Sequence, residues 1–482
     1  MTGHFLRIKR GLRMNTGFTA ARPTLTQHYL RMAFLGLFVI SLLVAFFCQW
    51  SGTSDAIIKS GTFAFICGII LSTCLSGSGA LSASVLCLVA FAFYALAVPL
   101  HHLFNQDYDD SGVQFVTSMC VVGLAGQIFG YLLMGKPRFT RMPTPTNTSS
   151  FGLSVIILGT LALIIAIGAT SGFSAYFQAG YAGRALLKRE VGPVELGLYY
   201  IVVGYLFVAF NWLFRTSGRR SVGMGFFLLG FLGVFVVYVS FLGIRRPSFF
   251  MVFSLVTLYF LSIRGKASKS ILFLTLFMAF LFGIFAQFRQ VLSDHGAMEA
   301  LTYVFTHFDF SWFDLSSSEL GAPFRTMLDV KDTWFADGWQ WGRSYVDALV
   351  NVFPSSLVKY RDSLSVEYTN AFFTQDYIAI GGNMGFFPVT EAYLNFGAPG
   401  VFFEFFILGL FIKYVENRAI EQADVLHTVI CAIMVPWFFF FLRTDFSSFL
   451  KSFTYSIIPV FFAYTLYAIA QMFRQNPPLK TV

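Results

Sequence analysis

Residues 224–263 read MGFFLLGFLGVFVVYVSFLGIRRPSFFMVFSLVTLYFLSI, two long apolar runs separated by a short gap that carries Arg245 and Arg246. Apolar runs of about twenty residues are long enough to cross a membrane as α-helices. Short loops on the outer side of a membrane usually lack Lys and Arg, and cations at membrane depth are costly unless an anion meets them. If the gap faces outside, the pair is a candidate anion-binding site.

The whole chain has the composition of a membrane protein. Of its 482 residues, 56% are apolar and only 12% are charged, and the mean hydropathy is +0.68. A soluble domain carries roughly twice that share of charge. The apolar runs are continuous rather than alternating, which favours helices over a β-barrel. We therefore predict an all-α polytopic membrane protein. The net charge of +9 does not indicate nucleic-acid binding, because the Lys and Arg residues flank apolar runs and form no basic face.

About twelve transmembrane spans are predicted. They cover approximately residues 30–49, 56–76, 81–100, 113–134, 152–171, 194–214, 224–242, 247–263, 270–288, 398–415, 425–442 and 449–470. We predict that both termini are cytoplasmic, because this topology puts most Lys and Arg residues on the cytoplasmic side of the membrane. Lys413 and Arg418 are among these cytoplasmic cations. The chain then divides into a basic N-terminus (1–29), nine spans (30–288), a long external segment (289–397), three spans (398–470) and a tail (471–482).

Three groups of cations remain in short external loops: residues 184–189 with Arg184 and Arg189, the pair Arg245 and Arg246, and Arg443. Isolated external cations are explained by snorkelling to lipid headgroups, and we prefer that explanation for Lys59, Lys451 and Arg289. The three groups come from separate parts of the chain. We therefore predict that they share an anion site.

The external segment 289–397 is predicted to be a folded cap, because it holds most of the acidic groups and several aromatic clusters. Residues 297–305 form one expected helix, capped by Ser293-Asp294, and residues 343–353 form a second that stops before Pro354. The aromatic residues between Trp334 and Trp341 fit either an interfacial belt or sugar stacking.

The most informative stretch is residues 381–400, GGNMGFFPVTEAYLNFGAPG. Pro388 suits the start of a short helix and Gly397 its left-handed end, before the next span. Glu391 and Asn395 are four residues apart and share a helix face. A carboxylate held at this boundary could act as a base; the alternative is a Glu that pairs with arginine or caps a helix end. Glu404, inside the next span, is expected to pair with a neighbouring helix.

This stretch resembles the glycine-rich, Glu-Ala-Tyr, Asn-Phe-Gly pattern of bacterial oligosaccharide repeat-unit polymerases of the O-antigen polymerase type. Three further segments, within a resemblance that spans roughly residues 150–450, are similar to that family. They are Leu242-Gly-Ile-Arg245-Arg246-Pro-Ser, the loop 172–184 with Arg184, and Leu442-Arg443-Thr-Asp445-Phe.

The resemblance implies a GT-C-like, polyprenol-dependent membrane glycosyltransferase of the bacterial inner membrane. Undecaprenyl-pyrophosphate-linked oligosaccharide would be both donor and acceptor at the periplasmic face, with membrane lipid and a chain-length regulator protein as further partners. No metal or other cofactor is implied. The proposed roles are catalytic base for Glu391, pyrophosphate binding for Arg184, Arg245, Arg246 and Arg443, and support for Arg189, Tyr393, Asn395 and Asp445.

Two other motifs could contribute chemistry. Asp107-Tyr-Asp109-Asp110 has the Asp-x-Asp spacing that binds divalent cations in some glycosyltransferases, although a solvated loop is the more ordinary explanation. His307, with Asp309 two residues on, is a second conceivable base.

Two other functions remain open. A transporter or flippase for lipid-linked sugars would also have about twelve spans and internal cations, although no internal repeat of the kind common in transporters is present. An O-antigen ligase would handle the same donor and differ only in its acceptor.

Overall fold

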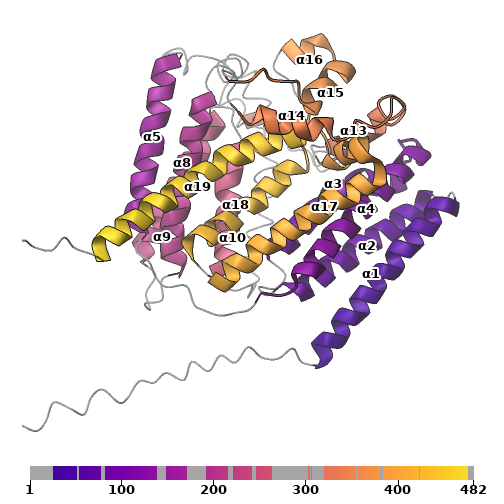
Figure 1. The fold of residues 1–482 in the computed structure, drawn as a ribbon, viewed down its shortest axis with the longest axis horizontal. Helices are drawn as coiled ribbons and strands as arrows, with labels where there is room; N and C mark the ends of the chain where they lie inside the picture. The colour runs from indigo at the N-terminus through magenta and orange to yellow at the C-terminus, as the bar shows by residue number, and fades with distance from the viewer. Residues whose placement is uncertain are drawn as a thin grey trace, which may run out of the picture.

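The computed structural model describes residues 25–51, 54–76, 82–137, 148–170, 192–214, 221–241, 246–262, 302–303, 306, 320–353, 357–379, 384–422 and 424–475. The regular elements in these ranges are all helices (Figure 1). They are α1 (Leu25–Ser51), α2 (Ser54–Leu75), α3 (Ala83–Asn105), α4 (Asp110–Met134), α5 (Ser149–Thr170), α8 (Gly192–Phe214), α9 (Val222–Phe241), α10 (Arg246–Ser262), α13 (Ala322–Val330), α14 (Arg343–Asn351), α15 (Leu364–Phe372), α16 (Gln375–Ala379), α17 (Pro388–Gln422), α18 (Val425–Phe441) and α19 (Phe446–Gln475).

Within the described residues, nine helices are long and apolar enough to cross a membrane: α1 to α5, α8, α9, α17 and α19. Two shorter apolar helices, α10 and α18, join them. Each predicted span coincides with one of these eleven helices, except 270–288, which lies outside the described residues. The helical, multi-pass prediction is confirmed, and the total of twelve stays a prediction.

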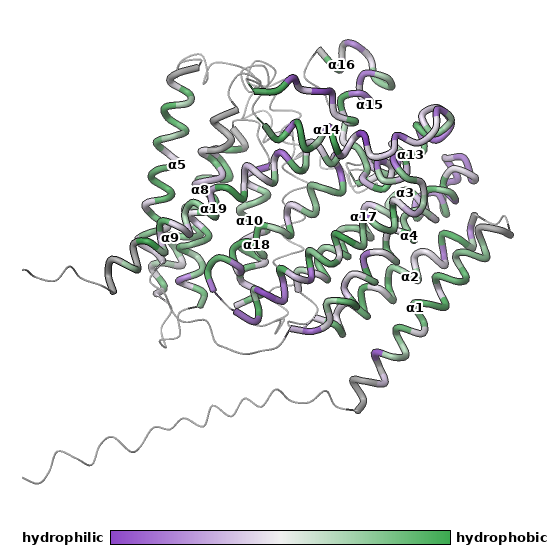
Figure 2. Tube along the Cα trace, in the orientation of Figure 1, coloured by the Kyte–Doolittle hydropathy of each residue, from purple (hydrophilic) through white to green (hydrophobic). Residues whose placement is uncertain are grey.

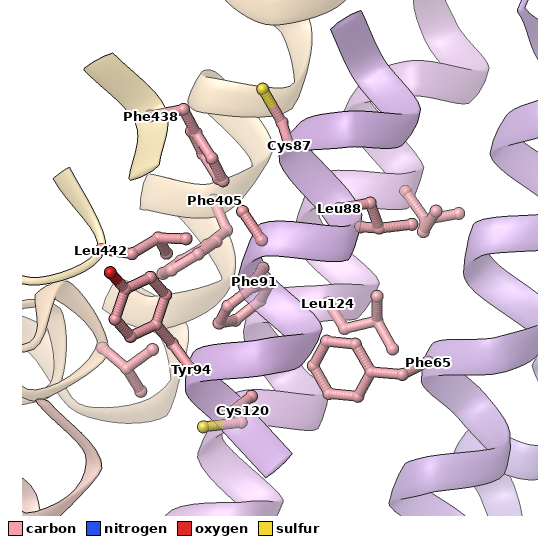
Figure 3. Packing of buried hydrophobic residues seen from close by; sticks show 14 of the residues in the cluster. Phe65, Cys87, Leu88, Phe91, Tyr94, Cys120, Leu124, Phe405, Phe438 and Leu442 are labelled. Atoms are coloured by element: carbon pink, nitrogen blue, oxygen red, sulfur yellow. The ribbon is translucent and has the colours of Figure 1, made fainter. Parts of the chain in front are cut away.

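The membrane helices form two hydrophobic cores that meet at α18. Helices α1 to α4 and α17 supply the first core, and α5, α8, α9, α10 and α19 supply the second. Figure 3 shows the first core, where Phe91 of α3 stacks on Phe405 of α17 with ring centroids 4.5 Å apart. Ile430 of α18 packs against both cores, so α18 connects them.

Glycines let α4 and α17 approach at backbone distance. A Cβ at Gly126 of α4 would lie 2.2 Å from the carbonyl oxygen of Phe402, and a Cβ at Gly130 would lie 2.5 Å from that of Phe406. On α17, a Cβ at Gly409 would lie 2.4 Å from the carbonyl oxygen of Gln127. Small residues at such spacing are typical of helix contacts in membranes, where close packing replaces the hydrophobic effect as the source of association.

Lys413, predicted among the cytoplasmic cations, lies inside the bundle. Its side chain is fully buried, and its Nζ lies 3.2 Å from an oxygen of Glu416, which is also fully buried. The second oxygen of Glu416 accepts a hydrogen bond of 2.9 Å from the backbone N–H of Ser84, in the first turn of α3. The ion pair therefore ties α17 to the start of α3.

A cap covers one end of the bundle and contains α13, α15 and α16 (Figures 1 and 2). Lys331, directly after α13, lies 2.8 Å from Asp109 in the loop between α3 and α4. Val330, Leu364 and Phe386 form part of a small separate core in the cap. The cap and the α3–α4 loop therefore lie on the same side of the membrane, as the topology predicts.

Helix α17 breaks at Gly397, which has φ 66° and ψ −158°. This backbone region is open essentially to glycine alone. The start at Pro388 and the break at Gly397 are confirmed, but the helix resumes directly after the break and crosses the membrane. The carbonyls of Leu394 and Asn395 accept hydrogen bonds of 3.0 and 3.2 Å from the N–H groups of Gln340 and Trp341. These bonds satisfy carbonyls that the break leaves free.

A side chain at Gly126 should weaken the contact between α4 and α17. We expect Gly126→Ala to lower the free energy of unfolding by about 1–3 kcal/mol, because overpacking displaces the Phe402 backbone. Gly36→Ala on α1 is the control, since a Cβ there meets nothing within 4 Å. Thermal unfolding in detergent micelles measures both. Equal melting temperatures for the two variants would contradict this account of the contact.

Candidate functional site

A small polar pocket lies where the cap meets the membrane helices. Its walls come from α14, the first part of α17, the residues that precede and begin α15, and the start of α19. It is lined by Gln340, Arg343, Ser344, Asp347, Asn351, Asp362, Ser363, Leu364, Glu367, Glu391, Asp445 and Ser447. The interior volume is about 20 Å³, enough for one water-sized group and too small for a sugar ring.

Glu391, the predicted base, is fully buried in the first turn of α17. Its Oε1 accepts a hydrogen bond of 2.6 Å from the hydroxyl of Ser344 on α14. Its Oε2 accepts one of 2.6 Å from the backbone N–H of Phe446, the first residue of α19. Each carboxylate oxygen has a second lone pair, so the group keeps the capacity to accept another hydrogen bond.

Asp445, predicted as a supporting residue, is also fully buried in the pocket. One carboxylate oxygen accepts a hydrogen bond of 2.6 Å from the N–H of Ser448 and thereby caps α19. The other accepts one of 2.8 Å from the N–H of Ser365 in α15. The predicted stretches 381–400 and 442–446 therefore meet at the start of α19. They also touch at Gly385, where a Cβ would lie 2.0 Å from the carbonyl oxygen of Arg443.

The other two supporting residues on α17 face different surroundings. Asn395 is buried, and its amide donates to the hydroxyl of Ser344 at 2.8 Å, so it positions the group that bonds Glu391. Tyr393 packs against Phe335 and Phe115, with ring centroids 4.7 and 5.2 Å away. Tyr393 therefore holds the cap on α4 and does not line the pocket.

Two of the predicted arginines are described, and both lie at the cap side of α18. Arg246 is exposed, with its guanidinium carbon 4.1 Å from the ring centroid of Phe440. Arg443 is half-buried, one helical turn beyond Phe440. Arg184, Arg189 and Arg245 lie outside the described residues. The convergence of all the predicted arginines on one anion stays a prediction.

The pocket itself is acidic. The carboxylates that line it are Asp347, Asp362, Glu367, Glu391 and Asp445, and the one lining cation among the described residues is Arg343. Burial raises the pKa of Glu367, while the charge of Arg343 acts in the opposite direction. Such a surface suits hydroxyl groups and cations, which donate to carboxylates, and repels phosphate groups.

The inward face of α14 is the part of the site that sequence reasoning missed. Ser344, Asp347 and Asn351 are buried on one face of this helix. Asp347 pairs with Arg361, and Asn351 donates a hydrogen bond of 3.0 Å to Ser447 of α19. Their helical spacing was a usable signal, because polar residues at i, i+3 and i+7 form a stripe in a helix. His307 and Asp309 lie outside the described residues.

The Asp-x-Asp loop has separate partners for each carboxylate. Asp107 lies 2.9 Å from His101, and Asp110 lies 2.7 Å from His102. Asp109 caps α4 through the N–H of Gly112 and pairs with Lys331. In the described part of the chain, no three His, Cys, Asp or Glu residues are grouped so that they could hold a metal ion. The contacts fit a loop that braces the cap.

Comparisons of the chain with protein-family models, with curated proteins and with solved structures find no match. The fold and site therefore define the class on their own. The chain is a polytopic α-helical membrane protein with a buried, carboxylate-lined pocket under an extramembrane cap.

The contacts of Asp109 predict that the stability of the protein depends on pH. Hydrogen bonds from Lys331, Ser111 and Gly112 lower the pKa of Asp109 below its ordinary value. A carboxylate with a depressed pKa contributes stability above its unfolded pKa, about 3.9, and loses that contribution as the pH falls further. Asp109→Asn keeps a capping oxygen and removes the charge. We expect the parent to melt at a higher temperature than this variant near neutral pH, with a gap that shrinks below about pH 4.

The control for this measurement is Asp332→Asn. Asp332 is 80% exposed and lies 3.6 Å from Lys331, so its removal should change the melting temperature little at any pH. A gap between the parent and Asp109→Asn that widens in acid would contradict the assignment.

Proposed function

We propose that this protein is a membrane glycosyltransferase that polymerises lipid-linked oligosaccharide repeat units. The growing glycan would leave undecaprenyl pyrophosphate and join the end sugar of a lipid-linked acceptor at the cap side of a bacterial inner membrane. The observation that carries the proposal is Glu391. This carboxylate lines a pocket at the boundary between cap and membrane helices and is held by Ser344 and Phe446.

In the proposed reaction, an acceptor hydroxyl donates its hydrogen bond to Glu391 and attacks the anomeric carbon of the donor glycan. The new glycosidic C–O bond forms as the bond from that carbon to the pyrophosphate oxygen breaks. The hydroxyl proton passes to Glu391, and the electron pair leaves with undecaprenyl pyrophosphate. Asn395 and Ser344 position the carboxylate through the hydrogen bonds between them.

The acidic character of the pocket favours the acceptor over the pyrophosphate as its proposed occupant. Hydroxyl groups donate to carboxylates, whereas phosphate oxygens are repelled by them. The described cations suited to a pyrophosphate, Arg246 and Arg443, lie at the end of α18. Guanidinium groups there would stabilise the charge that develops on the leaving group.

A pocket of about 20 Å³ must widen before a sugar enters. Catalytic hydrogen bonds often tighten only in the substrate complex, so a closed pocket is compatible with this role. The wall that α14 provides is held by Asp347–Arg361 and by the hydrogen bond from Asn351 to Ser447.

The direct experiment incubates the purified protein with lipid-linked repeat units alone and separates the products by length. We expect a ladder from the parent, and a rate lower by about 100-fold or more for Glu391→Gln, because the amide cannot accept the proton. Gln has nearly the shape of Glu and can still hydrogen-bond to Ser344 and Phe446. Asp332→Asn, which removes an exposed cap carboxylate outside the pocket, is the control and should retain most activity.

Each outcome separates the competing functions. No ladder from the folded parent contradicts the polymerase. Transfer only to a different lipid acceptor would indicate a ligase, and movement of the lipid-linked sugar without transfer would indicate a transporter. If Glu391→Gln formed the ladder at the parental rate, Glu391 would not be the base, and its role would be to cap the start of α19.

Arg246 offers a second measurement on the donor side. We expect Arg246→Ala to slow ladder formation by about tenfold or more, through loss of charge stabilisation at the pyrophosphate. Arg418→Ala is a matched control, because Arg418 also stacks on an aromatic ring, that of Tyr414, with 5.3 Å between its guanidinium carbon and the ring centroid. It belongs to the far end of α17. If both variants lost the same amount of activity, Arg246 would be better explained as a cation that snorkels to lipid headgroups.

A further inference from the structure

Helix α14 is amphipathic in the reverse of the usual sense. Ser344, Asp347 and Asn351 are buried, whereas Val346 and Leu349 are 59% and 60% exposed. The neighbouring cap helix α13 has the ordinary arrangement and buries Phe324, Met327 and Val330. The outward face of α14 is therefore a surface of large apolar side chains, and such a surface is unfavourable in water.

Hydrogen bonds place α14 at the level of the membrane-embedded helices. The hydroxyl of Tyr345 donates to Glu404, which lies about 10 Å beyond Gly397 along α17 at 1.5 Å per residue. At the other end, the carbonyl of Val352 accepts a hydrogen bond of 3.2 Å from Tyr455, about 13 Å along α19 from its first residue. Helix α14 contacts α19 and α17, and Figure 1 shows it beside the cap-side end of α19.

The membrane helix α17, which α14 contacts, also carries exposed apolar side chains. On α17, Phe403 and Ile407 are 58% and 62% exposed within the membrane span. Tyr345 of α14 stacks on Phe396, which lies directly before the break in α17. At the start of α14, Trp339 and Trp341 are exposed, with ring centroids 5.5 Å apart. Tryptophan is enriched where acyl chains give way to headgroups.

We infer that α14 is an interfacial helix whose apolar face lies against the acyl chains of the cap-side leaflet. Val346 and Leu349 form this face, and the exposed Phe353, two residues after the helix, extends it. Interfacial helices insert one face at the boundary between headgroups and acyl chains and keep a polar face away from it. Here the polar face lines the acidic pocket instead of facing water. In the part of the chain that the structure describes, α14 then lies between the pocket and the lipid.

This placement has a consequence for substrate entry, which rests on the proposed function. A substrate anchored by a polyprenyl chain stays in the membrane, so its sugar would reach the pocket sideways from the leaflet. Movement of α14 would open that route. The contacts that hold α14 closed are those of Tyr345 with Glu404, Asp347 with Arg361, and Asn351 with Ser447.

The test measures where the outward face of α14 lies, using nitroxide labels in vesicles of phosphatidylcholine and phosphatidylglycerol. Leu349→Cys and Val346→Cys report on α14. Ile407→Cys is the lipid-facing reference, and Asp332→Cys, at a side chain that is 80% exposed in the cap, is the aqueous reference. Collision with oxygen indicates lipid, and collision with a water-soluble nickel chelate indicates water. The labelled parent gives the background of the six native cysteines.

We expect both α14 labels to match Ile407→Cys, with an oxygen-to-nickel collision ratio several-fold above that of Asp332→Cys. A ratio that matches Asp332→Cys would overturn the inference, because the face would then lie in water. Protection from both reagents would overturn it as well, since a second copy, another protein or another part of this chain would then cover the face. The measurement needs no turnover, so it can fail or succeed independently of the polymerase proposal.

Discussion

The first turn of α19 donates backbone hydrogen bonds to two buried carboxylates, and the pocket depends on this arrangement. A buried carboxylate is costly unless its oxygens are hydrogen-bonded. The first N–H groups of a helix have no partner within it, and the helix dipole favours negative charge there. Phe446 donates to Glu391 of α17, while Ser448 donates to Asp445, which also bonds Ser365 of α15. One helix end therefore joins the cap to the membrane bundle.

The break in α17 makes this junction possible. The part of the helix before Gly397 belongs to the pocket and presents Glu391 and Asn395, whereas the part after it packs on α4 within the membrane. Because the backbone turns at Gly397, the two parts of α17 point in different directions, one along the pocket and the other along α4. The carbonyls released at the break bind Gln340 and Trp341, which places the start of α14 beside the pocket. The backbone break and the start of the pocket wall therefore meet at one glycine position.

The sequence was most informative where one residue type admits one explanation. Long apolar runs predicted the spans, and Pro388 with Gly397 predicted the start and break of α17. Separate stretches of the sequence predict Glu391 and Asp445 as site residues, and the structure brings both into one pocket. The spacing of the Ser, Asp and Asn residues in α14 indicates a polar stripe on one face of the helix, but only tertiary packing shows that this stripe faces inward and forms a pocket wall. Nor could sequence show that Lys413 pairs with Glu416 inside the bundle, since a cation near a span end usually reaches water.

The acidic pocket favours hydroxyl groups, whereas the arginines at the end of α18 favour phosphate groups. The proposed reaction requires these two surfaces to be separate. An acceptor hydroxyl needs a carboxylate, and a departing pyrophosphate needs cations, yet each group would weaken the other if they shared one surface. The segment that carries Arg443 touches Gly385 and continues directly to Asp445. The turn between α18 and α19 therefore has a cation at one end and a pocket carboxylate at the other. In the proposed reaction, the anomeric carbon would lie beside this turn. The departing pyrophosphate would face Arg443, and the attacking acceptor hydroxyl would face Glu391.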